Sequence, residues 1–264
     1  MEWWLGYAAI GAAVGFFAGM LGIGGGAIMV PLLVMAFEAQ GLPKSHILHL
    51  AVGTGMATIL FTSVASVRAH AARGAIRWDI ARNITPGILL GGLVGSWIAS
   101  FIPPLIFAAI FTAVIYIAAT NMLLDRKPKA SRQPPGFAGM FVFGFLVSAV
   151  SAFTAIGGAF MTVPFMLWCN VPLLQAIGTA AMIGFPIALS GTIGFIATGL
   201  RETGLPPYSV GFVYLPALTG IVVSSMLMAP VGAAAAHRLP TLWLKRIFAV
   251  LFYIMATRML FTFV

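Results

Sequence analysis

Charged residues are scarce in this sequence. They make up 7% of its 264 residues, whereas a soluble domain carries about a quarter. Hydrophobic residues make up 61%. A soluble fold could not bury this much apolar surface, because a compact domain still exposes a large share of its area to water. The composition therefore predicts an all-α polytopic membrane protein, in which each spanning helix needs about 20 predominantly apolar residues.

Cysteine and acidic residues are also few. The single cysteine, Cys169, excludes an intrachain disulfide and a thiolate metal cluster. Asp79 and Asp125 fall at predicted membrane edges, so no pair of aspartates is expected inside the membrane. The zinc-protease motif H-E-x-x-H is absent. We expect no metal, no cofactor and no enzymatic activity, with a membrane-embedded enzyme as the alternative from another class.

The basic residues give the chain a net charge of +9. In a soluble protein this charge would suggest a nucleic-acid partner. Here the bases occupy short loops between apolar segments, where they set the orientation of membrane helices. We expect the lipid bilayer and no nucleic acid as partner, and the sequence predicts no oligomeric state.

Glycine, proline and charge divide the chain into apolar segments. The first segment stops at Gly22-Ile23-Gly24-Gly25-Gly26, which is too rich in glycine for a helix interior. The chain opens on Met1-Glu2-Trp3-Trp4 without a basic region, so we expect this segment to remain in the mature protein. The predicted helices cover residues 3–21, 27–37, 45–72, 78–101, 103–124, 136–155, 159–168, 172–199, 209–237 and 240–263.

The second part of the chain repeats the first. In the first part, Ile23-Gly24-Gly25 is followed by Val30-Pro31. In the second part, Ile156-Gly157-Gly158 is followed by Val163-Pro164 at the same interval. The proline-rich and charged stretch 125–135 lies between the two parts and is typical of a linker. We predict a first transmembrane repeat at 1–124, a cytoplasmic linker at 125–135 and a second transmembrane repeat at 136–264.

The positions of the bases predict the orientation. Placing the linker in the cytoplasm puts eleven of the 14 bases on that side and leaves Lys44, Arg201 and Arg258 outside. We therefore expect a multi-pass protein of the cell (inner) membrane with both termini outside. The first repeat then begins outside and the second inside. Such inverted repeats with matched broken helices are a recurring plan of secondary transporters, whose substrate binds near the bilayer midplane.

The two glycine breaks are the predicted anion site. Each begins a half-helix, at Ala27 and Ala159, whose first N–H groups lack partners within the helix and lie at the positive end of its dipole. Glycine lets an anion approach the backbone. Close helix packing is the alternative role of the glycines, and bonding to their own helix is the alternative for the hydroxyls. The predicted substrate-binding residues are Gly24, Gly25, Gly26, Ala27, Gly157, Gly158, Ala159, Thr54, Thr179, Thr154 and Ser190.

These motifs resemble the TauE/SafE family, also called the sulfite exporter family, over nearly the whole chain. The resemblance rests on the paired Ile-Gly-Gly…Val-Pro motifs and on the short motifs that follow them. It implies a transporter for sulfite, for sulfonates such as sulfoacetate, or for a related small organic anion. The matching motifs are 51–54 (AVGT), 176–179 (AIGT), 73–74 (RG), 78–79 (WD), 209–212 (SVGF), 230–233 (PVGA), 237–240 (HRLP) and 245–248 (KRIF).

The mechanism leaves two alternatives open. A secondary transporter would alternate access to the site, whereas an anion channel could use the same helix ends. No carboxylate is predicted deep in the membrane, so a carboxylate proton relay is not expected. His46 and His49, in the first turns of one helix, would either take up protons or lie as polar residues at the membrane interface.

Overall fold

The computed structural model describes residues 2–21, 25–124, 132–236 and 241–263. These residues form ten helices and one short hairpin of two strands. The first half contains α1 (Glu2–Leu21), α2 (Gly26–Ala39), α3 (Lys44–Ala72), α4 (Trp78–Ser100) and α5 (Pro104–Leu124). The second contains α6 (Phe137–Ala152), α7 (Ala159–Trp168), α8 (Leu173–Gly199), β1 (Ser209–Val210), β2 (Val213–Tyr214), α9 (Leu215–Ala236) and α10 (Thr241–Phe263).

The apolar segments become helices because a backbone in lipid must satisfy its own hydrogen bonds. Five of the described helices are long and apolar enough to cross a membrane by length and composition. The predicted fold class, an all-α polytopic membrane protein, is confirmed. Short helices begin after both glycine breaks, at Gly26 and at Ala159.

Two predicted helices have the wrong bounds. The helix predicted from residue 209 begins only at Leu215, because residues 209–214 form an antiparallel hairpin in which Ser209 pairs with Tyr214. Gly211 has φ +55° at its turn, which a helix cannot continue through. The helix predicted to reach Ala155 ends at Ala152, since Ala155 itself has φ +50°.

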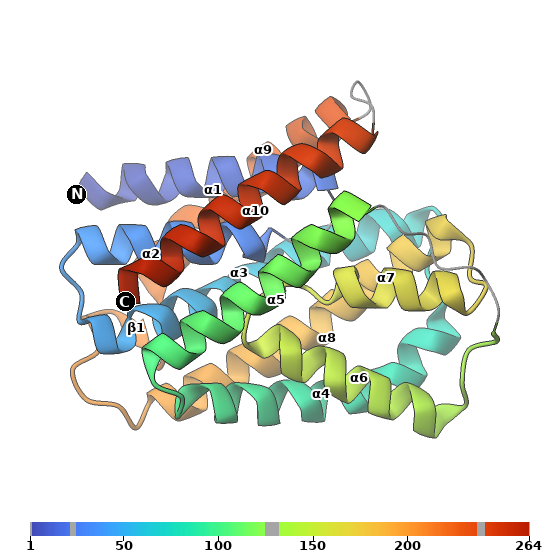
Figure 1. Ribbon diagram of the computed structural model, residues 1–264, viewed down its shortest axis with the longest axis horizontal. Coiled ribbons are helices and arrows are strands. Elements are labelled where there is room, and N and C mark those ends of the chain that lie inside the picture. The colour runs from blue at the N-terminus through green and yellow to red at the C-terminus, as the bar shows by residue number, and fades with distance from the viewer. Residues whose placement is uncertain (1, 22–24, 125–131, 237–240, 264) are drawn as a thin grey trace.

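The helices of the two halves exchange partners (Figure 1). α1 packs along α9, and α6 packs along α4. The long helices α3 and α8 contact each other in the middle of the bundle, and α5 packs on α10. In Figure 1 both termini lie at one end of the molecule, whereas α5 ends and α6 begins at the opposite end.

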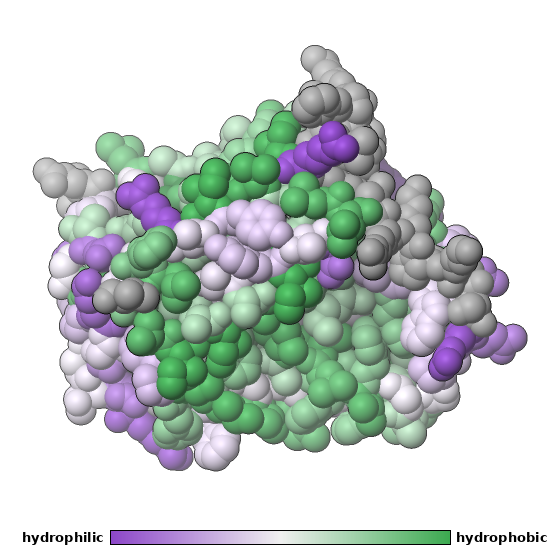
Figure 2. Space-filling view, in the orientation of Figure 1, coloured by the Kyte–Doolittle hydropathy of each residue, from purple (hydrophilic) through white to green (hydrophobic). Residues whose placement is uncertain are grey.

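The surface has the distribution of hydropathy expected for a protein in a bilayer. Figure 2 shows hydrophobic residues over the middle of the visible face and most of the hydrophilic residues toward its two ends, where the loops lie. Many large apolar side chains are exposed, among them Trp97, Leu146 and Leu227. No lysine, arginine, aspartate or glutamate is buried among the side chains that the structure describes. This is the distribution expected for a protein whose long axis in these figures runs across the membrane.

Candidate functional site

The two glycine breaks have nearly the same backbone geometry. Gly25 has φ 65° and ψ −10° and stands immediately before α2. Gly158 has φ 69° and ψ −15° and stands immediately before α7. Both values lie in the left-handed region, which a residue with a Cβ adopts only at a cost. The turn into each half-helix therefore depends on glycine at that position.

Each break leaves two backbone N–H groups ahead of the first helical hydrogen bond. The carbonyl of Gly25 accepts from Ile28 at 3.1 Å and from Met29 at 3.0 Å. The carbonyl of Gly158 accepts in the same way from Met161 at 3.0 Å and from Thr162 at 2.9 Å. The N–H groups that precede these donors point away from the helix body and have no acceptor within it. They belong to Gly26 and Ala27 in α2 and to Ala159 and Phe160 in α7.

The two breaks touch each other inside the bundle. A Cβ added to Gly26 would overlap the carbonyl oxygen of Ala155 and lie 3.3 Å from the backbone nitrogen of Ile156. Gly55 on α3 lies beside the same contact, since its added Cβ would be 3.2 Å from the Cβ of Ala155. Ala155 and Ile156 are almost fully buried. The beginning of α2 thus meets the segment just before α7 in the protein interior.

Gly157 borders open space although it is buried. No described heavy atom lies within 4 Å of the position that a Cβ on Gly157 would occupy. The nearest approach from α8 is at Gly184, whose own added Cβ would lie 3.6 Å from the carbonyl oxygen of Gly157. Most other glycines at helix contacts in this protein would instead collide with a neighbouring backbone. Among the described residues, the second break is therefore not packed against a neighbour at this position.

Thr54 and Thr179 hold loops from the opposite half of the chain. The hydroxyl oxygen of Thr54 on α3 accepts a hydrogen bond from the backbone N–H of Tyr214 at 3.0 Å. That of Thr179 on α8 accepts from the backbone N–H of Arg77 at 2.9 Å. Both threonines are fully buried. These hydroxyls hold the segments that lead into α9 and α4, a role that the sequence did not predict.

The remaining predicted site residues differ in their surroundings. The hydroxyl of Ser190 donates to the carbonyl of Pro186 in its own helix at 2.9 Å, which is the alternative foreseen for it. The hydroxyl of Thr154 makes a long contact of 3.5 Å with the carbonyl of Val150 and lies next to the break. Gly24 lies outside the described residues.

Sequence reasoning missed two serines of α6. Ser148 and Ser151 are fully buried, and their hydroxyls have no hydrogen-bond partner among the described residues. The hydroxyl oxygen of Ser151 lies 3.9 Å from the Cβ position of Gly158. Buried polar atoms are rarely left unpaired in proteins. The only signal in the sequence is a pair of hydroxyl residues three apart just before the second glycine break.

Charged and titratable groups lie apart from the breaks. His49 is buried within the protein, and its Nε2 lies 3.1 Å from the carbonyl oxygen of Ala99 while Phe212 stacks on its ring. At the membrane edge, hydrogen bonding to Asp79 raises the pKa of the Arg77 guanidinium. Among the residues searched, no group of three or more histidine, cysteine, aspartate or glutamate side chains is placed to hold a metal ion.

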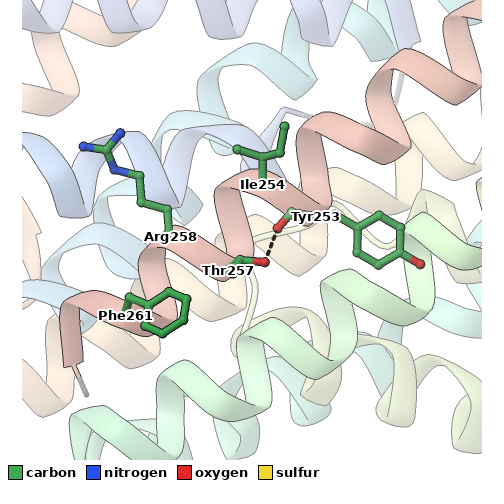
Figure 3. A pocket seen from close by; sticks show the side chains of 5 residues that line it. All are labelled: Tyr253, Ile254, Thr257, Arg258 and Phe261. Carbon is green, nitrogen blue, oxygen red and sulfur yellow. Dashed lines mark hydrogen bonds between the residues drawn. The ribbon is translucent and has the colours of Figure 1, made fainter.

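A surface groove of about 420 Å³ lies along α10, far in sequence from both breaks. Figure 3 shows its five lining residues on this helix, with the hydroxyl of Thr257 bonded to the carbonyl of Tyr253 at 2.6 Å. Tyr253, Thr257 and their neighbours also contact α5 through side-chain hydrogen bonds. The groove contains none of the predicted site residues, and its lining is mostly apolar, as expected for a helix that faces lipid.

Comparison with known proteins gives a match over almost the entire chain. The family described as "Sulfite exporter TauE/SafE" matches residues 7–259. A "probable membrane transporter protein" of Haemophilus influenzae is 34% identical over 251 residues, which cover 95% of each chain. The "probable membrane transporter protein YdhB" of Bacillus subtilis is 26% identical over 239 residues, covering 88% of this chain and 90% of its own. No solved structure matches.

Proposed function

This chain belongs to the sulfite exporter TauE/SafE family, and from that membership we propose that it is a secondary transporter for a small anion, sulfite or an organosulfonate such as sulfoacetate. The protein is a membrane transporter by family and by its relatives. The anion and the alternating-access mechanism are our proposal. The observation that supports it most strongly is the contact between Gly26 and Ala155, which brings the beginning of α2 against the glycine break before α7 in the interior.

We propose that residues 1–124 and 136–264 are inverted repeats joined by the linker 125–135. The helix contacts support this proposal. The first helix of the first half, α1, packs on the fourth helix of the second half, α9, and the first helix of the second half, α6, packs on the fourth helix of the first half, α4. In Figure 1, α1 and α6 begin at opposite ends of the molecule. The surroundings of the breaks correspond as well: the nearest side chain to Gly25 is Val14, eleven residues before it, and Val147 stands at the same interval before Gly158.

The helix ends supply the charge complementarity. Two helix N-termini each contribute about 0.3–2 kcal/mol toward an anion, and their free N–H groups can bind oxyanion oxygens directly. Lysine and arginine side chains are absent from the described interior. A buried fixed cation would need a counterion whenever the site was empty. Donors without net charge let an anion bind and still leave, which a carrier requires.

The orientation stays a prediction. We place the protein in the cell (inner) membrane with both termini outside and the linker in the cytoplasm, since this puts most bases inside. The structure supports the relative arrangement, because both termini lie at one end and the end of α5 at the other.

Flux in proteoliposomes tests the function. We expect saturable uptake of ³⁵S-sulfite that accelerates when unlabelled sulfite is present inside the vesicles, because a carrier returns faster when loaded. A thermal-shift screen with sulfite, sulfate, thiosulfate, sulfonates and carboxylates would identify the preferred anion. Uptake that rises linearly with concentration and shows no acceleration would favour the channel and contradict alternating access.

A further inference from the structure

Hydroxyl side chains on the helices of this protein usually bond to their own helix. The hydroxyl of Ser96 donates to the carbonyl of Gly92 at 2.7 Å, and that of Ser224 donates to the carbonyl of Gly220 at 2.8 Å. Such bonds are the ordinary solution for serine and threonine in a membrane helix. Against this background, three buried helix hydroxyls lack a partner among the described residues. Thr192 on α8 is single, whereas Ser148 and Ser151 are a pair of exceptions on α6.

Both exceptions lie on one face of α6. Residues three apart share a face of a helix. Ser151 lies close to Gly158, the residue immediately before α7. One turn earlier, the hydroxyl oxygen of Ser148 lies 2.8 Å from the Cβ position of Gly92 on α4, beside the hydroxyl of Ser190. The two free hydroxyls therefore extend from the beginning of α7 along α6.

The first half has no counterpart of these hydroxyls. Ala18 stands seven residues before Gly25, as Ser151 stands seven before Gly158, and Ala18 takes the equivalent place beside the break. Gly15 stands at the position equivalent to Ser148. The two breaks thus share their backbone geometry but differ in the hydroxyl groups around them.

We propose that Ser151 and Ser148 donate hydrogen bonds to the transported anion, and that the anion is held on the second-half side of the contact between the breaks. This inference rests on the proposed function. An SO₃ head group has three oxygens, each able to accept more than one hydrogen bond. The N–H groups of Ala159 and Phe160 and the hydroxyl of Ser151 provide three donors at or near the beginning of α7, and no described atom lies within 4 Å of a Cβ added to Gly157. The hydroxyl of Ser148 is a fourth donor one turn earlier on α6.

The serines would be unpartnered in the empty protein because their partner is the substrate. A buried unpaired hydroxyl costs about 1–3 kcal/mol, so its removal should leave the empty protein as stable as before or more stable. The stabilisation by sulfite is the readout that separates a binding role from a structural one, because loss of a merely structural hydroxyl would not change it.

Uptake of ³⁵S-sulfite by proteoliposomes containing Ser151→Ala, Ser148→Ala or Ser224→Ala tests the proposal. We expect KM to rise about tenfold in Ser151→Ala, the size of effect given by losing a hydrogen bond to a charged group. A smaller rise is expected in Ser148→Ala. Ser224→Ala is the matched control, since its hydroxyl already bonds to the carbonyl of Gly220 in its own helix, and its KM should stay within about twofold of wild type.

The thermal-unfolding midpoint without substrate is the second measurement. It should be unchanged or higher in Ser151→Ala, and the stabilisation by sulfite should be smaller than in wild type. If the wild-type protein transports sulfite and Ser151→Ala has the same KM, that result would overturn the role of the serine but not the proposed function. Absence of saturable sulfite flux in the wild type would overturn the proposed function together with it.

Discussion

The hydroxyl oxygen of Thr179 accepts a hydrogen bond from the backbone N–H of Arg77 at 2.9 Å, across 102 positions of sequence. The bond between Thr54 and Tyr214 repeats this arrangement with the two halves exchanged. The glycine before each threonine is part of the same contact. A Cβ on Gly178 would overlap the carbonyl oxygen of Ala75, and a Cβ on Gly53 would overlap that of Phe212.

Each of these Gly-Thr pairs thus secures the loop that leads into a helix of the other half. Loss of the threonine hydroxyl would leave a buried backbone N–H unpaired, which costs about 1–3 kcal/mol. We expect Thr179→Val and Thr54→Val each to lower the thermal-unfolding midpoint, by roughly 2–4 °C for each kcal/mol. Thr58→Val is the control, because the hydroxyl of Thr58 bonds only to its own helix at 2.9 Å. Equal midpoints in all three variants would contradict the role of these bonds.

The contact between the breaks leads to a second prediction. In Gly26→Ala the added methyl would overlap the carbonyl oxygen of Ala155, so α2 must move away from the segment between α6 and α7. We expect a lower unfolding midpoint, by an overpacking cost of about 1–3 kcal/mol, and a loss of ³⁵S-sulfite uptake. Gly136→Ala is a suitable control, because its methyl meets no described atom within 4 Å and its φ is −61°. Wild-type uptake in Gly26→Ala would show that the contact is dispensable.

The individual helices were the predictable part of the fold, because each is marked in the sequence by its own apolar segment and its own helix-breaking residues. Composition, glycine breaks and prolines predicted all ten helices, because in lipid an apolar segment has few alternatives to a helix. The hairpin at 209–214 was missed, since its apolar residues continue into α9 without a polar interruption. Its shape depends on Gly211 and on contacts with α8, where the N–H of Phe212 donates to the carbonyl of Phe195 at 3.2 Å.

The site was predictable only where it is built from backbone. Duplicated glycines indicated both breaks, and the structure gives both the same left-handed turn. The hydroxyl partners depend on which helices face each other, which the sequence did not predict. Substrate binding by Thr54 and Thr179 stays a prediction, and the structure adds that their hydroxyl oxygens accept hydrogen bonds from the backbone of two loops. Ser148 and Ser151 went unnoticed, because only the packing of α6 reveals that their hydroxyls are unpartnered.

Cysteine labelling tests the orientation. In a Cys169→Ser background, we expect Ser131→Cys to resist a membrane-impermeant maleimide added to intact cells, because the basic linker should lie in the cytoplasm. Thr203→Cys should react, since Thr203 is exposed in the loop between α8 and β1. Opening the cells should make both positions reactive. Labelling of residue 131 from outside, with residue 203 protected, would reverse the proposed topology.

The last prediction concerns the open space beside Gly157. Substitutions at Gly25 and Gly158 cannot isolate substrate binding, because a side chain at a φ of 65° or 69° also strains the backbone. Gly157 is free of this difficulty: it is not among the glycines with positive φ, and its added methyl would enter unoccupied space. We expect Gly157→Ala to keep or slightly raise the unfolding midpoint, since replacing glycine at a compatible position stabilises by about 0.4–1 kcal/mol. If the space holds the anion, the same methyl should lower Vmax/KM for ³⁵S-sulfite by about tenfold, which corresponds to about 1.4 kcal/mol of binding. The pairing of undiminished stability with weakened transport separates this outcome from the damage expected in Gly26→Ala. Full transport by a stable Gly157→Ala protein would place the substrate elsewhere.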